Sequence, residues 1–210
     1  KMWDRRYKRT ADFVVIEGAH AGGHLGFSRE ELAHLYEPDY EANYDDEIRR
    51  IIACVHEYGE KYGVHIPVIT AGGIMNARQV QHAFALGAEG VQVATPFVTT
   101  EECDADVAFK QAYVDAKPGD AVIVKSPVGM PGRALNNNFI ADIVPQGCKI
   151  KRCFNCLTHC DPKTIPYCIS QALFNGANGD IDHGLIFCGA NVAKVDKITT
   201  VHEIFEELTK

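Results

Sequence analysis

A histidine that follows two glycines is the first feature of this sequence that could do chemistry. The segment EGAHAGGHLGF, residues 17–27, places His24 directly after Gly22 and Gly23, with His20 four residues earlier. An imidazole can accept a proton near neutral pH, and small neighbours leave room for a flat cofactor and a substrate. The pattern makes His24 a candidate general base. From the residues alone the favoured alternative is a hydrogen-bonded structural histidine in a loop, and His20 is expected at the rim of the site.

Glycines also end a second apolar segment of the chain. IPVITAGGI, residues 66–74, contains Gly72 and Gly73, and GVQVATPF, residues 90–97, is the next apolar segment. Loops of this kind let backbone N–H groups approach an anion closely, so two of them side by side would form a phosphate-binding cup. Glycine after a strand is more often a simple turn former, and one such loop alone favours that alternative.

Short apolar segments alternate with helical patterns along the first two thirds of the chain. Such an alternation indicates parallel strands covered on both faces, which is an α/β fold. The expected strands cover residues 13–16, 66–71, 90–95 and 121–125. The expected helices cover residues 44–62, a segment capped by Asn76, residues 104–116 and residues 200–208.

The spacing of the strands at Val68 and Val91 is typical of the βα units of an eightfold barrel. Four units are expected here, whereas a closed (β/α)8 barrel needs eight units and about 250 residues. We therefore predict the C-terminal half of a TIM-type barrel in residues 1–145 and a Cys-rich, mostly helical extension in residues 146–210. We expect about 100 to 150 further residues ahead of Lys1, in the same or another polypeptide. Without them, unpaired parallel edges would keep the chain from folding stably alone.

In this order and spacing, EGAHAGGHLGF, IPVITAGGI and GAEGVQVATPFVTTEEC resemble the nitronate monooxygenases, formerly called 2-nitropropane dioxygenases. The same superfamily includes the FMN-dependent enoyl-acyl-carrier-protein reductases. The resemblance is close over residues 10–140 and implies a TIM barrel that holds FMN, with a small extra domain. It also implies that His24 is the base of nitronate oxidation. The positions implied to bind FMN are Glu17, Gly22, Gly23, Gly72, Gly73, Gln92, Val93, Ala94 and Thr95.

Three positions depart from the family pattern. Glu17 stands where a flavin-contacting Gln is usual, Ala94 replaces the usual Gly, and Pro96 replaces a common Arg. Because Ala94 still offers its N–H group, phosphate binding is expected to survive, whereas Glu17 is expected to alter redox tuning or substrate choice. The resemblance also places Arg133 on the substrate side, where it could pair with an anionic group. The alternative is a solvated loop arginine.

Three functions remain open from the sequence. The first is an FMN-dependent oxidase or monooxygenase that acts on nitronates or nitroalkanes. The second is an FMN-dependent reductase that uses NAD(P)H to reduce an enoyl thioester. The third is a non-catalytic flavin-binding or assembly subunit. All three imply FMN, the first two imply a small-molecule substrate, and a homodimer is compatible with each.

The extension contains a dense group of thiols. Cys153, Cys156, Cys160 and Cys168 have the spacing C-x2-C-x3-C-x7-C, which could hold zinc or an iron–sulfur cluster. The spacing matches no standard ferredoxin pattern. The favoured alternative is a set of buried, reduced cysteines packed in a compact helical turn, and disulfides are the third possibility.

Composition and charge exclude several classes of protein. The formal net charge of −7 argues against a nucleic-acid-binding surface, which needs a basic patch. No run of about eighteen apolar residues is present, so no membrane span is expected. The basic start KMWDRRYKRT leads into no long apolar core, so we do not expect it to be a secretory signal. Cysteines crowded into one segment favour a reduced, cytoplasmic setting.

Overall fold

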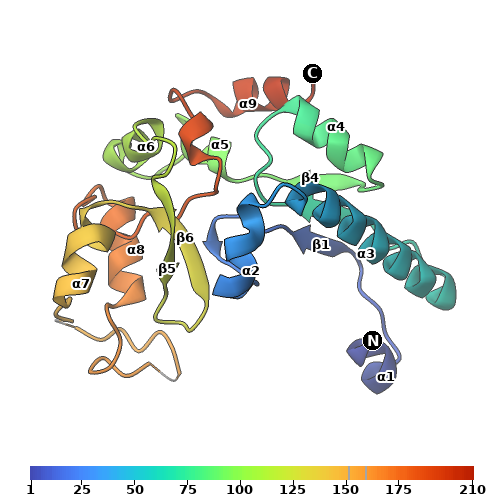
Figure 1. Ribbon diagram of the computed structural model, residues 1–210, viewed down its shortest axis with the longest axis horizontal. Coiled ribbons are helices and arrows are strands. Elements are labelled where there is room, and N and C mark those ends of the chain that lie inside the picture. Colours follow the sequence, from blue (N-terminus) through green and yellow to red (C-terminus); the bar gives the residue numbers. More distant parts are fainter. Residues whose placement is uncertain (151, 159) are drawn as a thin grey trace.

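The computed structural model describes residues 1–150, 152–158 and 160–210. A parallel sheet is formed by β1 (Val14–Glu17), β3 (Val68–Ala71) and β4 (Gly90–Gln92), in the order β1-β3-β4. The strand positions agree with the expected ones to within a few residues. In the described part of the chain these strands do not close a barrel, although the α/β class is confirmed (Figure 1).

The parallel sheet is covered by helices on one face. Ile16 of β1 and Val68 of β3 are buried against Ile48 and Ile52 of α3 (Tyr40–Tyr62). Because side chains alternate along a strand, Val15 points to the opposite face, where it is 40% exposed. The prediction that both faces are covered is therefore wrong for the described residues, and the uncovered face is the one that a barrel would turn inward.

Helix α3 begins earlier than expected and includes much of the acidic run before it. Its N-cap is Asp39, and Gly63 ends it in the left-handed conformation with φ 63°. No helix in the described part of the chain is long and apolar enough to cross a bilayer. Helix α4 (Ala77–Ala85) begins where expected, because the side chain of Asn76 accepts a hydrogen bond from the N–H of Gln79.

A second, antiparallel sheet was not expected. It has the order β2-β6-β5, with β2 (Gly23–His24), β6 (Pro131–Leu135) and β5 (Ala121–Lys125). The prediction that 121–125 forms a fourth parallel strand is wrong, because β5 forms a hairpin with β6. Pro131 and Gly132 made 131–135 look like a loop, since both residues weaken a strand pattern.

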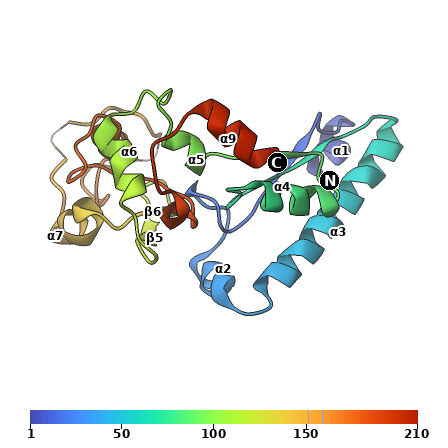
Figure 2. The same cartoon turned by 90° about the horizontal axis from the view of Figure 1, so that it is seen from above.

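The remaining elements are short. They are α1 (Met2–Tyr7), α2 (Arg29–Ala33), η1 (His34–Tyr36), α5 (Thr95–Val98), α6 (Val107–Val114), the π-helix η2 (Phe139–Ile143), α7 (Val144–Gln146), α8 (Ile169–Ala177), η3 (Val192–Lys194) and α9 (Val201–Leu208). In two perpendicular views α3 and α4 lie at one side of the molecule and β5, β6 and α7 at the other (Figures 1 and 2), and Figure 1 shows β1 beside α3. The chain thus has a parallel part and an antiparallel part.

The extension after residue 145 is not mostly helical, which corrects the prediction. Its described residues form α8, η3 and α9, and much of the rest is irregular. Segments on both sides of residue 145 share one core, in which Phe139 and Tyr167 pack edge to face with ring centroids 5.2 Å apart. The N–H of Leu135 also donates to the carbonyl of Ile186 at 2.8 Å. The extension therefore packs directly on the antiparallel sheet.

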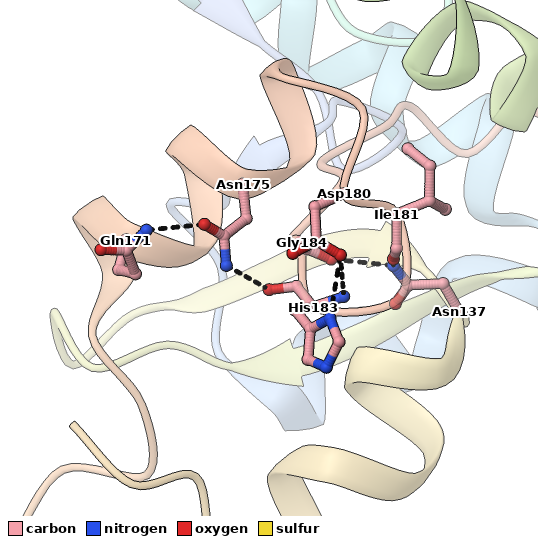
Figure 3. A network of polar contacts seen from close by, with 7 residues as sticks. All are labelled: Asn137, Gln171, Asn175, Asp180, Ile181, His183 and Gly184. Atoms are coloured by element: carbon pink, nitrogen blue, oxygen red, sulfur yellow. Dashed lines mark hydrogen bonds and ion pairs between the residues drawn. The ribbon is translucent and has the colours of Figure 1, made fainter. Parts of the chain in front are cut away.

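Polar contacts fix the extension to the segment that follows β6. The amide of Asn137 donates to the carbonyls of Ile181 and Gly184 at 2.7 and 2.8 Å (Figure 3). In the same network Asn175 of α8 donates to the carbonyl of His183 at 3.1 Å. These bonds hold the turn that leads into residues 185–188, which return to the sheet.

Candidate functional site

A pocket of about 310 Å³ lies at the carboxyl ends of the three parallel strands. Ligands of α/β sheets bind at this edge, because the loops there converge. The structure brings all the residues predicted to bind the cofactor to the lining of this one pocket: Glu17, Gly22, Gly23, Gly72, Gly73, Gln92, Val93, Ala94 and Thr95. Their role in binding FMN remains a prediction.

The loops after β3 and β4 offer backbone donors to this pocket. Gly72 and Gly73 have φ values of 100° and 77°, which side chains rarely adopt. The N–H groups of Gly73, Ala94 and Thr95 donate to no backbone carbonyl among the hydrogen bonds of the described residues. Unpaired N–H groups that line a concave surface favour an anion. The two loops therefore present N–H groups to one concave surface, which we call the cup, and its binding of a phosphate stays a prediction.

Two side chains hold the loop after β3 in place. The carbonyl of Gly73 accepts hydrogen bonds from Asn191 at 2.6 Å and from Gln79 at 3.0 Å. A Cβ atom at position 73 would lie 2.7 Å from the Cβ of His20. The position is thus fixed from both sides, and only glycine fits it without a shift.

Arg133 holds the loop after β1. Its guanidinium group donates to the carbonyl of Ala19 at 2.6 Å and to the carbonyl of Ala21. The residue is 2% exposed and is not among those that line the pocket. A solvated loop arginine, the alternative reading, is therefore wrong, and these contacts give Arg133 a role in shaping the loop. Its pairing with a substrate stays a prediction.

His24 lies beside the pocket, on β2. Its ring packs edge to face against Phe187 with centroids 4.9 Å apart, and its Nε2 lies 2.7 Å from the hydroxyl of Ser126. Partial burial lowers the pKa of His24 below the ordinary value of 6.5. The ring is therefore neutral at pH 7, the form that can accept a proton.

Glu17 and His20 occupy different environments. Glu17 ends β1 and lines the pocket, and partial burial raises the pKa of its carboxyl group above the ordinary value of 4.5. His20 instead lines a neighbouring cavity of about 320 Å³ on the other side of the glycine loop, where its Nε2 contacts Glu41 at 3.1 Å. His20 is therefore separated from the pocket, rather than at its rim.

Several lining residues were missed by the sequence reasoning. Tyr113, Phe187, Cys188 and Gly189 line the pocket, and the hydroxyl of Tyr113 donates to the carbonyl of Phe187. Cys188 is 3% exposed, and burial raises the pKa of its thiol to about 12, so it packs as a neutral apolar group. A Cβ atom at Gly22 would lie 2.5 Å from the backbone of Cys188. The signal in the sequence that could have identified these residues is the apolar run LIFC followed by a glycine, residues 185–189.

The thiols of the extension are not assembled as a ligand set. Cys153 and Cys156 are exposed, so their predicted burial in a helical turn is wrong, while Cys160 and Cys168 are partly buried. The thiol of Cys156 accepts a hydrogen bond from Ser170 at 3.0 Å. Among the described residues no group of three or more His, Cys, Asp or Glu side chains is placed to hold a metal ion. The zinc or iron–sulfur site stays a prediction.

Comparisons with known proteins agree with one another. The family described as nitronate monooxygenase matches residues 3–210. A probable nitronate monooxygenase of Staphylococcus saprophyticus is 33% identical over 129 residues, which are 61% of this chain and 33% of that protein. One from Staphylococcus aureus strain Newman is 35% identical over 136 residues, 65% of this chain and 35% of that protein. This chain therefore spans about a third of the length of these relatives.

Solved structures extend the similarity to the fold. FabK from Thermotoga maritima matches with a TM-score of 0.66 and 27% identity, covering 99% of this chain and 55% of that chain. The nitroalkane oxidase of Streptomyces ansochromogenes matches with a TM-score of 0.61 and 25% identity, covering 94% of this chain and 50% of that chain. The likeness thus includes the extension as well as the parallel sheet.

Proposed function

This chain belongs to the nitronate monooxygenase family, and from that premise we propose that it acts in an FMN-dependent oxidation of alkyl nitronates or nitroalkanes by O2. The observation that carries the proposal is the convergence of two glycine loops on one pocket, with His24 directly after the lining residue Gly23. Names of relatives add support: two are probable nitronate monooxygenases and one solved structure is a nitroalkane oxidase.

The pocket suits a cofactor that carries a phosphate. Gly73, Ala94 and Thr95 would hold the phosphate with backbone N–H groups, which present no bulk and cannot titrate. The pocket volume of about 310 Å³ lies at the lower end of the range for ligand sites. When bound, FMN would supply the electron acceptor for the oxidation.

His24 would move the proton. A nitroalkane must lose a proton from its acidic carbon, and a neutral imidazole beside the pocket can take it. Partial burial lowers the pKa of His24, so at pH 7 the neutral form of the ring, which can accept a proton, is favoured. Gly22 and Gly23 come directly before it and add no side chains that would obstruct a substrate. A preformed nitronate has already lost this proton and needs the base less.

Glu17 gives the pocket a carboxyl group at the end of β1. Its raised pKa means that it gains a proton at a higher pH than a free glutamate does. A glutamate that gains a proton becomes a hydrogen-bond donor, whereas the ionised form can only accept. We propose that Glu17 is the position at which this chain adjusts flavin potential or substrate choice.

A second candidate is NAD(P)H-dependent reduction of an enoyl thioester. The superfamily that the sequence resembles includes FMN-dependent enoyl-acyl-carrier-protein reductases, and the fold matches FabK at least as well as it matches nitroalkane oxidase, with TM-scores of 0.66 and 0.61. In this case His24 would give a proton rather than take one.

Anaerobic spectroscopy of the purified full-length protein separates these functions. A flavin spectrum that is bleached by a nitronate supports the proposal. Bleaching by NADH or NADPH without any nitro compound favours the reductase. A yellow protein that responds to neither would be a flavin-binding subunit, and a protein that binds no FMN contradicts the proposal altogether.

A further inference from the structure

The antiparallel sheet brings a serine from a distant part of the chain to His24. In its register His24 lies opposite Gly132 of β6, and Gly132 lies opposite Val124 of β5. Ser126 follows β5, so His24 and Ser126 approach each other from the two flanks of β6. The residue of β6 between them is Gly132, which has no side chain. A Cβ atom at this position would lie 2.9 Å from the ring of Phe187, so a larger residue would not fit without a shift.

Ser126 is held firmly. It is 2% exposed, its carbonyl accepts a hydrogen bond from the N–H of Gly129 at 3.1 Å, and its hydroxyl oxygen accepts one from the N–H of Val128 at 3.3 Å. The same oxygen lies 2.7 Å from Nε2 of His24. A hydroxyl oxygen has two lone pairs, so it can accept from both groups at once.

The two ring nitrogens of His24 differ in their surroundings. Nε2 is occupied by Ser126. Nδ1 has no hydrogen-bond partner among the described residues, and it is not among their buried polar atoms that lack a partner, so it remains open to solvent. Of the two ring nitrogens, Nδ1 is therefore the one that a group from outside the described residues could contact.

We infer that Ser126 is a positioning residue, whose hydroxyl accepts a hydrogen bond from Nε2 of His24 and so leaves Nδ1 as the nitrogen that exchanges a proton with substrate. The inference rests on the proposed function. In the nitroalkane reaction the proton leaves the substrate carbon for Nδ1, and the electron pair of the C–H bond stays on the substrate. The ring becomes an imidazolium, and its Nε2–H bond to Ser126 strengthens because the donor is now charged.

A pair of variants isolates the hydroxyl group. Ser126→Thr keeps it and Ser126→Val removes it, while both add a branched side chain of the same shape. Nitrogen NMR of the full-length protein with ¹⁵N-labelled histidine reports the tautomer and the pKa of each ring, and His24→Asn identifies the signals of His24. The wild type and Ser126→Thr should carry the neutral-state hydrogen on Nε2. Ser126→Val should lose this preference, and its His24 should have a lower pKa, because the imidazolium loses an acceptor.

Activity gives a second measurement. Ser126→Val should have kcat/KM for a neutral nitroalkane about 10- to 100-fold below that of Ser126→Thr, the range for one hydrogen bond to a group that becomes charged. A hydrogen on Nδ1 in the wild type, or equal tautomers and pKa values in the two variants, would overturn the inference. If the NMR results are as expected and no nitro compound is oxidised, the hydrogen bond is supported and the proposed function is wrong.

Discussion

The two sheets of this chain contribute different kinds of atoms to one pocket and its immediate surroundings. The parallel sheet ends in glycine loops that present backbone N–H groups, as at Gly73 and Ala94. The antiparallel sheet carries side chains: His24 on β2 and Arg133 on β6. Backbone donors tolerate changes of side chain as long as the chain path is kept, whereas an imidazole has no substitute of equal basicity. The parallel part should therefore be sensitive to shape and the antiparallel part to chemical identity.

The largest expected effect is at His24. His24→Asn keeps a similar size and removes the base, so kcat/KM for a neutral nitroalkane should fall by about 10²- to 10⁴-fold, the usual range for a positioned base. The flavin spectrum should be unchanged, because the cup is built on the other sheet. Steady-state kinetics measure the loss in kcat/KM, and the absorption spectrum shows whether the flavin is still bound in the same way.

The oxidation of a preformed nitronate is the internal control for this variant. It should suffer less, since the carbon proton has already been lost. Equal losses on both substrates would mean that His24 stabilises charge instead of taking a proton. Near-native rates on every substrate would mean that His24 is a structural histidine. They would also contradict the expectation that the antiparallel part is sensitive to chemical identity.

Arg133 should show its effect in stability. Arg133→Met removes the donors to the carbonyls of Ala19 and Ala21 and leaves these buried groups without them, so we expect the free energy of unfolding to fall by roughly 2–4 kcal/mol. Chemical denaturation of the full-length protein measures it. Arg49→Met is the matched control, because the contact of Arg49 with Asp46 is exposed, and exposed pairs contribute about 0–1 kcal/mol. A rise in KM with unchanged stability would instead support the predicted contact of Arg133 with substrate.

Sequence reasoning succeeded where the signal is local. Strands β1, β3 and β4 are short apolar runs, two of which end at glycines, and the start of α4 follows from the capping residue Asn76. For β5 the strand was predicted correctly but its partner was not. An apolar run of five residues does not say whether its neighbour is parallel or antiparallel, and the true neighbour was hidden by Pro131 and Gly132.

The same distinction applies to the site. The residues of the glycine loops that line the pocket could be predicted from the sequence, because each loop is a contiguous motif. Ser126 lies 102 residues from His24, and Phe187 reaches the pocket from the extension. Contacts over such separations depend on the strand order, and no periodicity or spacing in one sequence records it. The burial of Arg133 was missed for the same reason.

A smaller effect is expected at Gly73, where the comparison predicts sensitivity to shape. Gly73→Ala places a Cβ atom 2.7 Å from His20 in a backbone conformation with φ 77°, so the loop must shift. We expect the Kd for FMN to rise about 10-fold, from a strain on the order of 1–2 kcal/mol. Flavin fluorescence titration measures it. Gly63→Ala is the control, since Gly63 has φ 63° with nothing within 4 Å and lies far from the pocket lining. If both variants bind FMN equally well, the cup does not depend on the path of this loop.

The smallest effect is expected at Ala94, where the sequence departs from the usual glycine of the family. Ala94 has φ −128°, which an alanine adopts without strain, and its N–H group has no backbone acceptor among the described residues. Ala94→Gly keeps that N–H group and adds only backbone freedom, which costs about 0.5–1 kcal/mol when the loop is ordered. The Kd for FMN should therefore rise by no more than about fivefold, and the rate with a saturating nitronate should stay the same. Flavin titration at fixed salt gives the first value and stopped-flow bleaching the second. A marked gain in affinity would mean that the methyl group of Ala94 obstructs the phosphate. The departure would then weaken cofactor binding, and side-chain identity would count in the parallel sheet as well.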